Sequence, residues 1–187
     1  MAGMKPNPYR ILACISVAAA IFAAAPVRAL DPATESALDA AIQGEHRTAE
    51  DQARDAFRKP KEVLDFLGFR SDMTVVEIWP GGGWYSKILA PALSERGAFY
   101  AAQYSVNPAY GYQRRYFGAF LTMLGETPDL YRDVKVTHLS LPYQLEIAPA
   151  GSADLVLTFR NVHNWVGRGY ACLLYTSPSP RDKIHDL

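Results

Sequence analysis

The sequence predicts a single α/β domain built around a mostly parallel sheet. The first observation is the β-branched segment Met73–Ile78, which leads through a proline and three glycines into the helically spaced segment Trp84–Leu93. The second is the recurrence of short apolar segments, typical of buried strands, at Ala98–Gln103, Val134–Leu139 and Asp154–Phe159. The third is the length of chain between these strands, which suffices for the crossovers that parallel pairing requires.

Before the first strand, the spacing of apolar residues predicts three helices over about residues 33–43, 48–57 and 60–67. Thr48, followed by acidic residues, and Pro60 are the start signals of the second and third helices. We expect these helices to cover the edge of the sheet and the mouth of the site.

Between the second and third strands, the aromatic-rich residues 107–112 are expected to form a loop. The segment Arg115–Leu124 has helical spacing, with Tyr116, Phe120 and Met123 along one stripe. We interpret this stripe as core packing.

The N-terminal end of the 187-residue chain reads as a signal peptide over residues 1–29. Lys5 and Arg10 precede an apolar run, and Val27 and Ala29 place small residues at both positions that a signal peptidase reads, so cleavage is expected after Ala29. The alternative is an uncleaved membrane anchor, for which the run is short, since a span needs about 20 apolar residues. The prediction is an exported, periplasmic protein without a membrane span after cleavage.

Residues 172–187 do not continue the pattern that precedes them. The stretch Cys172–Asp182 resembles the translation of a transposase-type sequencing adapter, and the alternative is an ordinary Pro/Ser-rich tail. On the first interpretation native sequence ends near Ala171, after the fourth strand, so the domain over residues 30–171 is incomplete and the tail is non-native. We then expect this polypeptide to be unstable and inactive, because one flank of its sheet is unpaired.

The composition argues against several classes of function. The chain has 19 Lys+Arg and 19 Asp+Glu residues, so no basic surplus indicates a nucleic-acid partner. Both cysteines, Cys14 and Cys172, fall in the terminal segments, which leaves the domain without a disulfide or a cysteine metal site. His46, His138 and His163 lack the spacing of metal ligands, and we expect no metal.

The turn after the first strand is the principal candidate site, because a strand, a glycine turn and a helix in this order form a nucleotide-binding corner. The run Gly81–Gly83 satisfies two glycines of the dinucleotide fingerprint and lacks the third, and Trp84 and Tyr85 take the place of the pyrophosphate. This pattern favours an adenosine cofactor without phosphate. The carboxylate of Glu77 can accept a hydrogen bond from the amino group of such a cofactor. The alternative is a tight strand–helix connection that binds no ligand.

These residues resemble the class I S-adenosylmethionine-dependent methyltransferases. The segment Val75–Gly83 is similar to that family's first motif, an acid followed by G-x-G-x-G. Together with Ile88–Pro91 and Arg160–Trp165, it resembles a group of predicted bacterial methyltransferases with export signals, over about residues 54–167. The resemblance implies a Rossmann-like class I methyltransferase fold, S-adenosylmethionine as the cofactor and methyl transfer to a small-molecule acceptor.

Two positions depart from the family pattern. Trp79 stands where the family has its first glycine, and Gln103 stands where the second strand normally ends in an acid that holds the ribose hydroxyls. A neutral amide is a weaker partner for a diol than a carboxylate. The family sheet also has seven strands, whereas four are predicted here. The expected cofactor-binding residues are Glu77, Pro80, Gly81, Gly82, Gly83, Trp84, Tyr85 and Gln103.

A polar and aromatic cluster, Arg160–Trp165, follows the fourth strand. Ligands of open α/β sheets bind beyond the carboxyl ends of the strands, so the cluster is expected beside the glycine turn. By the resemblance it lies where the methyl group meets its acceptor. The predicted catalytic residues are His163 as a base, Asn161 to orient it and Arg160 to hold an anionic substrate. The competing interpretation is that His163 and Trp165 pack against the N-terminal helices, which we favour for Trp165.

Two functions follow from these observations. The first is an S-adenosylmethionine-dependent methyltransferase. The second is a non-catalytic exported domain that binds adenosine or another metabolite on the same fold. The departures at Trp79 and Gln103 favour the second, as does the export signal, since the cofactor is made in the cytoplasm. An NAD-dependent oxidoreductase is disfavoured by the missing third glycine.

Overall fold

The structure is a computed structural model of the chain, and it describes residues 30–141, 143–167 and 169. The predicted signal peptide and the predicted non-native tail over residues 172–187 lie outside the described residues. Among the described residues, none of the helices has the length and apolar character that crossing a membrane requires.

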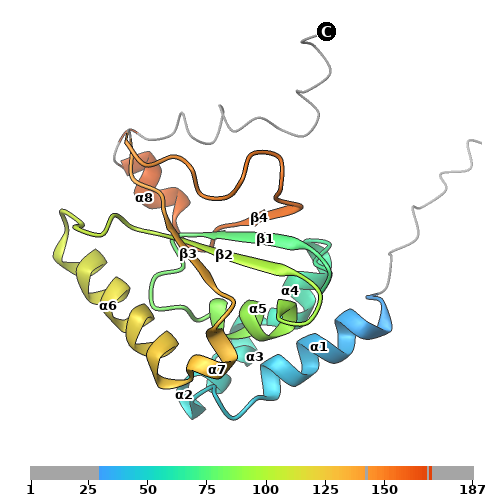
Figure 1. The fold of residues 1–187 in the computed structure, drawn as a ribbon. Helices are drawn as coiled ribbons and strands as arrows, with labels where there is room; N and C mark the ends of the chain where they lie inside the picture. Colours follow the sequence, from blue (N-terminus) through green and yellow to red (C-terminus); the bar gives the residue numbers. More distant parts are fainter. Residues whose placement is uncertain (1–29, 142, 168, 170–187) are drawn as a thin grey trace, which may run out of the picture.

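Four strands of the described residues form one parallel sheet, which confirms the predicted α/β class (Figure 1). They are β1 (Thr74–Ile78), β2 (Ala98–Gln103), β3 (Lys135–His138) and β4 (Leu155–Leu157). The order across the sheet is β3-β2-β1-β4, and every pair is parallel. The chain therefore builds outward from β1 to β3 and then crosses to the other side of β1. This reversal makes the carboxyl ends of β1 and β4 a topological switch point, where ligands of such sheets bind.

All four strands lie within the predicted segments, and the fourth differs most. β4 ends at Leu157, two residues before the predicted end. Thr158 bonds to the carbonyl of Ile78 through its hydroxyl, and Arg160 takes a left-handed backbone conformation, with φ of 62°. The chain therefore turns away from the sheet at the switch point instead of extending the strand.

The helices are α1 (Pro32–Gln43), α2 (Ala49–Ala53), α3 (Asp55–Arg58), α4 (Pro60–Phe66), α5 (Ser86–Leu93), α6 (Gly111–Glu126), α7 (Pro128–Tyr131) and α8 (Val162–Gly167). The predicted helix over 48–57 is divided at Arg54 into α2 and α3. α6 begins four residues before the predicted start, so the expected loop over 107–112 is partly helical. α7 and α8 were not predicted.

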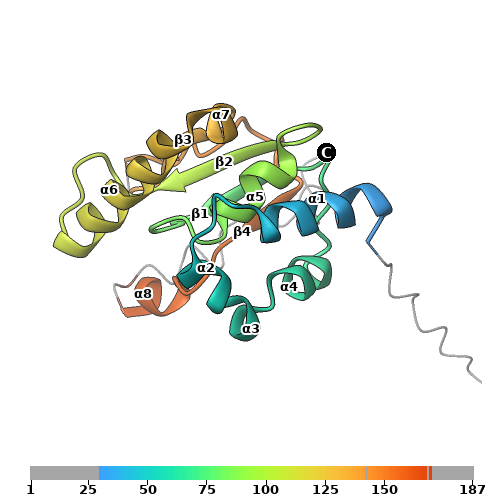
Figure 2. The ribbon, with the colours of Figure 1, turned by 90° about the horizontal axis from the view of Figure 1, so that it is seen from below.

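Helices α1, α4, α5 and α7 lie on one side of the sheet, and the segment between β3 and β4 lies with α8 on the other (Figures 1 and 2). Successive side chains of β1 point to opposite faces of the sheet, so Val75 belongs to the larger core cluster and Val76 to the smaller one. Phe120 and Met123 are buried in the larger cluster, which confirms that the α6 stripe is core packing. α1 packs along α5, so this first N-terminal helix lies against another helix and not along a sheet edge as expected.

Candidate functional site

A cleft of about 380 Å³ opens beyond the carboxyl ends of β1 and β4. Its walls come from α2 and α3, the glycine turn, the start of α6, and the corner between β4 and α8. The predicted site residues that line it are Glu77, Pro80, Gly81, Gly82, Trp84, Tyr85, Arg160, Asn161 and His163. The two predicted constellations, distant in sequence, therefore share one cleft, and α2 and α3 lie at its mouth as expected.

The glycines of the turn have different roles. Gly81 and Gly83 have φ values of 63° and 86°, in the left-handed region that favours glycine. A Cβ added at Gly81 would meet nothing within 4 Å, so this part of the turn is open to the cleft. A Cβ added at Gly83 would lie 2.8 Å from Sδ of Met123, so Gly83 permits close packing on α6. Gly83 is therefore structural and does not line the cleft.

Trp79 is left-handed as well, with φ of 51°. This backbone conformation costs a non-glycine residue about 1–2 kcal/mol. The indole Nε1 donates to the carbonyl of Leu139 at 3.0 Å, and the ring packs on Tyr104 and Trp165, with centroids 5.2 and 5.8 Å away. Trp79 thus adopts a backbone suited to glycine, and its buried ring offsets the cost. Trp165 is packed, as favoured, but against Trp79 and not against the N-terminal helices.

Glu77 is the buried acid of the site, with 2% of its surface exposed. The hydroxyl of Ser86, at the first position of α5, donates to Oε2 of Glu77 at 2.6 Å. Burial raises the pKa of Glu77 to about 7, against the hydrogen bond from Ser86 and the positive charge of Arg58. Near neutral pH this carboxyl is therefore poised to lose its proton when a cation binds beside it.

Gln103, which was expected to hold a ribose, lies behind the glycine turn. Its side chain is fully buried, and Nε2 donates to the carbonyl of Gly81 at 2.9 Å. Oε1 has no hydrogen-bond partner among the described residues. Gln103 does not line the cleft, so the structure gives it the role of fixing the turn.

Asn161 ties the two strand ends together. It is 5% exposed, and Nδ2 lies 3.1 Å from both the carbonyl of Ile78 and the carbonyl of Trp79. The side-chain amide of Asn161 therefore donates to carbonyls at the end of β1, and no hydrogen bond in the described part of the chain links it to His163. His163 is exposed on α8 and lines the cleft, so the packing interpretation is wrong for this residue.

Arginines from the N-terminal helices enter the site, which sequence reasoning missed. Arg54 and Arg58 line the cleft with Arg160. The Cζ atom of Arg58 lies 4.3 Å from the centroid of the Trp84 ring, a cation–π contact. The spacing of Arg54 and Arg58, four residues apart, was the available signal, since such residues share one helical face.

A buried ion pair positions these helices. Arg47 binds Asp55 through both terminal nitrogens, at 2.9 and 2.6 Å, and Nη1 also donates to the carbonyl of Ile42. Asp51 accepts from Lys87 of α5 at 2.5 Å, and its carbonyl accepts from the Trp84 indole at 3.2 Å. These contacts link α2 and α3 to the glycine turn.

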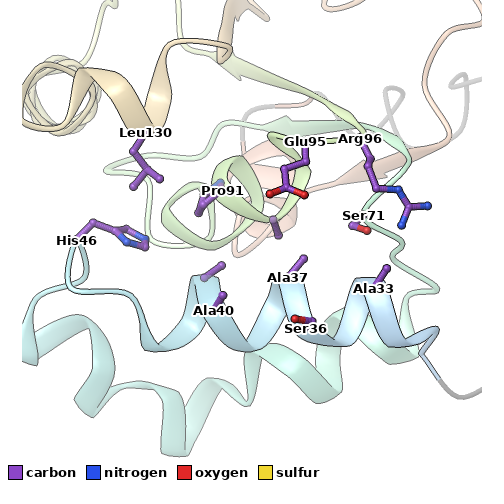
Figure 3. Close-up of a pocket in the computed structure, with 12 residues that line it drawn as sticks. Ala33, Ser36, Ala37, Ala40, His46, Ser71, Pro91, Glu95, Arg96 and Leu130 are labelled. Atoms are coloured by element: carbon purple, nitrogen blue, oxygen red, sulfur yellow. The ribbon is translucent and has the colours of Figure 1, made fainter.

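A second hollow of about 470 Å³ lies between α1 and α5 (Figure 3). Alanines of α1 and Pro91 form part of its walls, with His46 at one end and Glu95 and Arg96 at the other. The ring of His46 is engaged, because Nε2 lies 2.8 Å from the carbonyl of Lys87. No three His, Cys, Asp or Glu side chains gather as metal ligands in the part of the chain that the structure describes.

The chain matches no profile of a known protein family, no curated protein and no solved structure. Its function must therefore be inferred from its own residues.

Proposed function

We propose that the protein is an exported, periplasmic S-adenosylmethionine-dependent methyltransferase of class I fold that acts on a small molecule. The observation that carries this proposal is the meeting of the glycine turn, the buried Glu77 and the corner between β4 and α8 in one cleft at the switch point. A ligand in this cleft contacts both constellations that the sequence singled out.

The charge at the start of α5 favours a cofactor without phosphate. A helix N-terminus attracts anions, but the carboxyl of Glu77 already occupies this position through Ser86. A pyrophosphate placed there would meet a carboxyl group that carries part of a negative charge at neutral pH. A cationic amino group is favoured at the same place, because it stabilises the ionised form of Glu77.

The residues present fit S-adenosylmethionine. Glu77 would accept its ammonium group, and the open backbone at Gly81 and Gly82 allows close approach. Tyr85 stacks on Phe159, with ring centroids 3.6 Å apart, and this aromatic wall suits a purine. When bound, the cofactor supplies a methyl group whose bonding electron pair returns to sulfur as the acceptor's lone pair attacks.

The chain's own residues then position the acceptor and receive its proton. His163 lines the cleft, and its neutral imidazole can take a proton from an acceptor O–H or N–H group. Asn161 fixes the corner that carries Arg160 and His163. Because methyl transfer depends mainly on proximity and orientation, this positioning is the larger contribution.

A non-catalytic adenosine- or metabolite-binding domain is the second candidate. It is favoured by the place of Gln103 behind the turn, since no carboxylate from the end of β2 then holds the ribose. Both candidates place a small-molecule ligand in the cleft, and turnover separates them.

The test is equilibrium dialysis of the full chain with methyl-labelled S-adenosylmethionine, followed by detection of S-adenosylhomocysteine after addition of a small-molecule extract. We expect binding, and product that depends on the extract. Glu77→Gln should weaken binding about tenfold, whereas Glu95→Gln, a matched change in the second hollow, should leave it unchanged. Binding without product would support the second candidate, and the absence of binding would exclude the methyltransferase and leave only a domain that binds another metabolite.

A further inference from the structure

The cleft carries more positive charge than its own acids balance. Among the described residues, no carboxylate lies within 4.0 Å of Arg54, Arg58 or Arg160. The acids that line the same cleft are already engaged, because Asp51 pairs with Lys87 and Glu77 is buried against Ser86. The three guanidinium groups are therefore available to a ligand.

These arginines come from two separate walls. Arg54 and Arg58 belong to the α2–α3 segment, and Arg160 follows β4. Burial lowers the pKa of Arg58, and the charges of Arg54 and Arg160 lower it further, so Arg58 lies close enough to each of the other two arginines to be repelled by it. An anion bound between the walls would relieve this repulsion.

Arg58 is held by an aromatic contact, and Arg160 is exposed on a strained backbone. Arg58 stacks on Trp84, which keeps its planar guanidinium in a defined orientation with N–H groups at the edge. Arg160 has a left-handed φ of 62°, a strained conformation of the kind that persists at functional sites. A guanidinium fork matches the geometry of a carboxylate or a phosphate.

On the basis of the proposed function, we propose that the acceptor is an anionic small molecule, whose carboxylate or phosphate group is bound by Arg54, Arg58 and Arg160. Because Arg160 lies three residues before His163 and lines the same cleft, an anion bound there keeps the acceptor beside the base. The three arginines then determine specificity, and the glycine turn binds the cofactor.

The test is a calorimetric titration of the full chain at low ionic strength with two probes, inorganic phosphate and succinate, with and without saturating S-adenosylhomocysteine. Succinamide, which lacks charge, is the control ligand. We expect at least one anion to bind and succinamide not to bind. The relative affinities of phosphate and succinate indicate which anionic group the acceptor carries.

The variants Arg58→Gln and Arg160→Gln should each weaken anion binding at least tenfold and change S-adenosylhomocysteine binding less than twofold. Arg132→Gln, a matched change at an exposed arginine at the end of α7, should alter neither anion binding nor S-adenosylhomocysteine binding. Arg160→Lys, which keeps the charge but not the fork, should lose part of the affinity. Melting temperatures confirm that the variants fold.

Unchanged anion affinity in both glutamine variants would overturn this assignment. So would a loss of S-adenosylhomocysteine affinity without a loss of anion affinity, since the arginines would then serve the cofactor. Failure of the proposed function is a separate result: S-adenosylhomocysteine would not bind, while the titration without it would still report on the arginines.

Discussion

The cleft and the α1–α5 hollow are similar in size and differ in how the chain builds them. The α1–α5 hollow, about 470 Å³, is walled by alanines and holds one imidazole already engaged by a carbonyl. The cleft, about 380 Å³, gathers a buried carboxyl, unpaired guanidinium groups and aromatic rings. Two left-handed non-glycine residues, Trp79 and Arg160, line the cleft, and none lines the other hollow. Strain and unbalanced charge distinguish the cleft from the α1–α5 hollow, whereas volume does not.

The largest effect of a substitution on stability is expected in the glycine turn of the cleft. Gly83→Val places a β-branched residue at φ of 86° and a Cβ atom 2.8 Å from Sδ of Met123. We expect a loss of about 4 kcal/mol in the free energy of unfolding, from left-handed strain and overpacking together. Urea denaturation measures it. Gly118→Ala on α6, where a Cβ meets nothing, should be neutral or stabilising, and equal effects of the two changes would contradict the turn's role.

The second difference is the pH dependence of the stability that a carboxyl in each region contributes. The pKa of Glu77 is raised from 4.5 to about 7, so the folded protein keeps a proton that the unfolded chain has lost between these values. Its contribution to stability is fully present below pH 4.5 and is lost as the pH rises through 7, by about 3 kcal/mol. Glu77→Gln removes this titration, so the variant should gain that amount relative to the wild type between pH 4.5 and pH 8.

Urea denaturation of both proteins across this range tests the prediction. Glu95→Gln, which changes an exposed carboxyl in the other hollow, should show a constant difference from the wild type. A constant difference for Glu77→Gln as well would mean that the carboxyl is not buried as described.

A smaller effect is expected at the corner between β4 and α8. Asn161→Ala leaves the carbonyl of Trp79 without its side-chain donor and that of Ile78 with the Thr158 hydroxyl alone, at a cost of about 2 kcal/mol. Asn164→Ala, in the same cleft but without a side-chain hydrogen bond in the described part of the chain, should cost less than about 0.5 kcal/mol. Denaturant titration of the two variants compares them, and equal costs would argue against the tie between the strands.

The smallest effect is expected in the α1–α5 hollow. Ala40 is exposed on α1, so Ala40→Leu should change the free energy of unfolding by less than about 0.5 kcal/mol. Binding of S-adenosylmethionine should not change. A loss of binding in this variant, measured by dialysis, would show that the two hollows do not differ as described.

Local patterns were sufficient to predict the sheet and the turn. β-Branched runs and glycines act over a few residues, so the four strands and the turn around Gly81 were located correctly. The left-handed backbone of Trp79 was not predictable in this way, because it depends on a hydrogen bond to Leu139, 60 residues away.

The roles of single side chains in the site also depend on distant contacts. Asn161 was expected to orient His163, but pairing of β4 with β1 puts it against carbonyls more than 80 residues earlier. Gln103 faces the turn because β2 lies beside β1. Arg54 and Arg58 reach the cleft because a buried ion pair and contacts of Asp51 position α2 and α3, which no local pattern specifies.

The most direct test is calorimetric titration of the full chain with S-adenosylmethionine at pH 7, in two buffers that differ in ionisation enthalpy. Binding of the cationic cofactor should lower the pKa of Glu77 and release about half a proton, so the heats in the two buffers should differ. Glu77→Gln should bind more weakly and release no proton. No heat at millimolar cofactor would contradict the assignment of this cleft to an adenosyl cofactor.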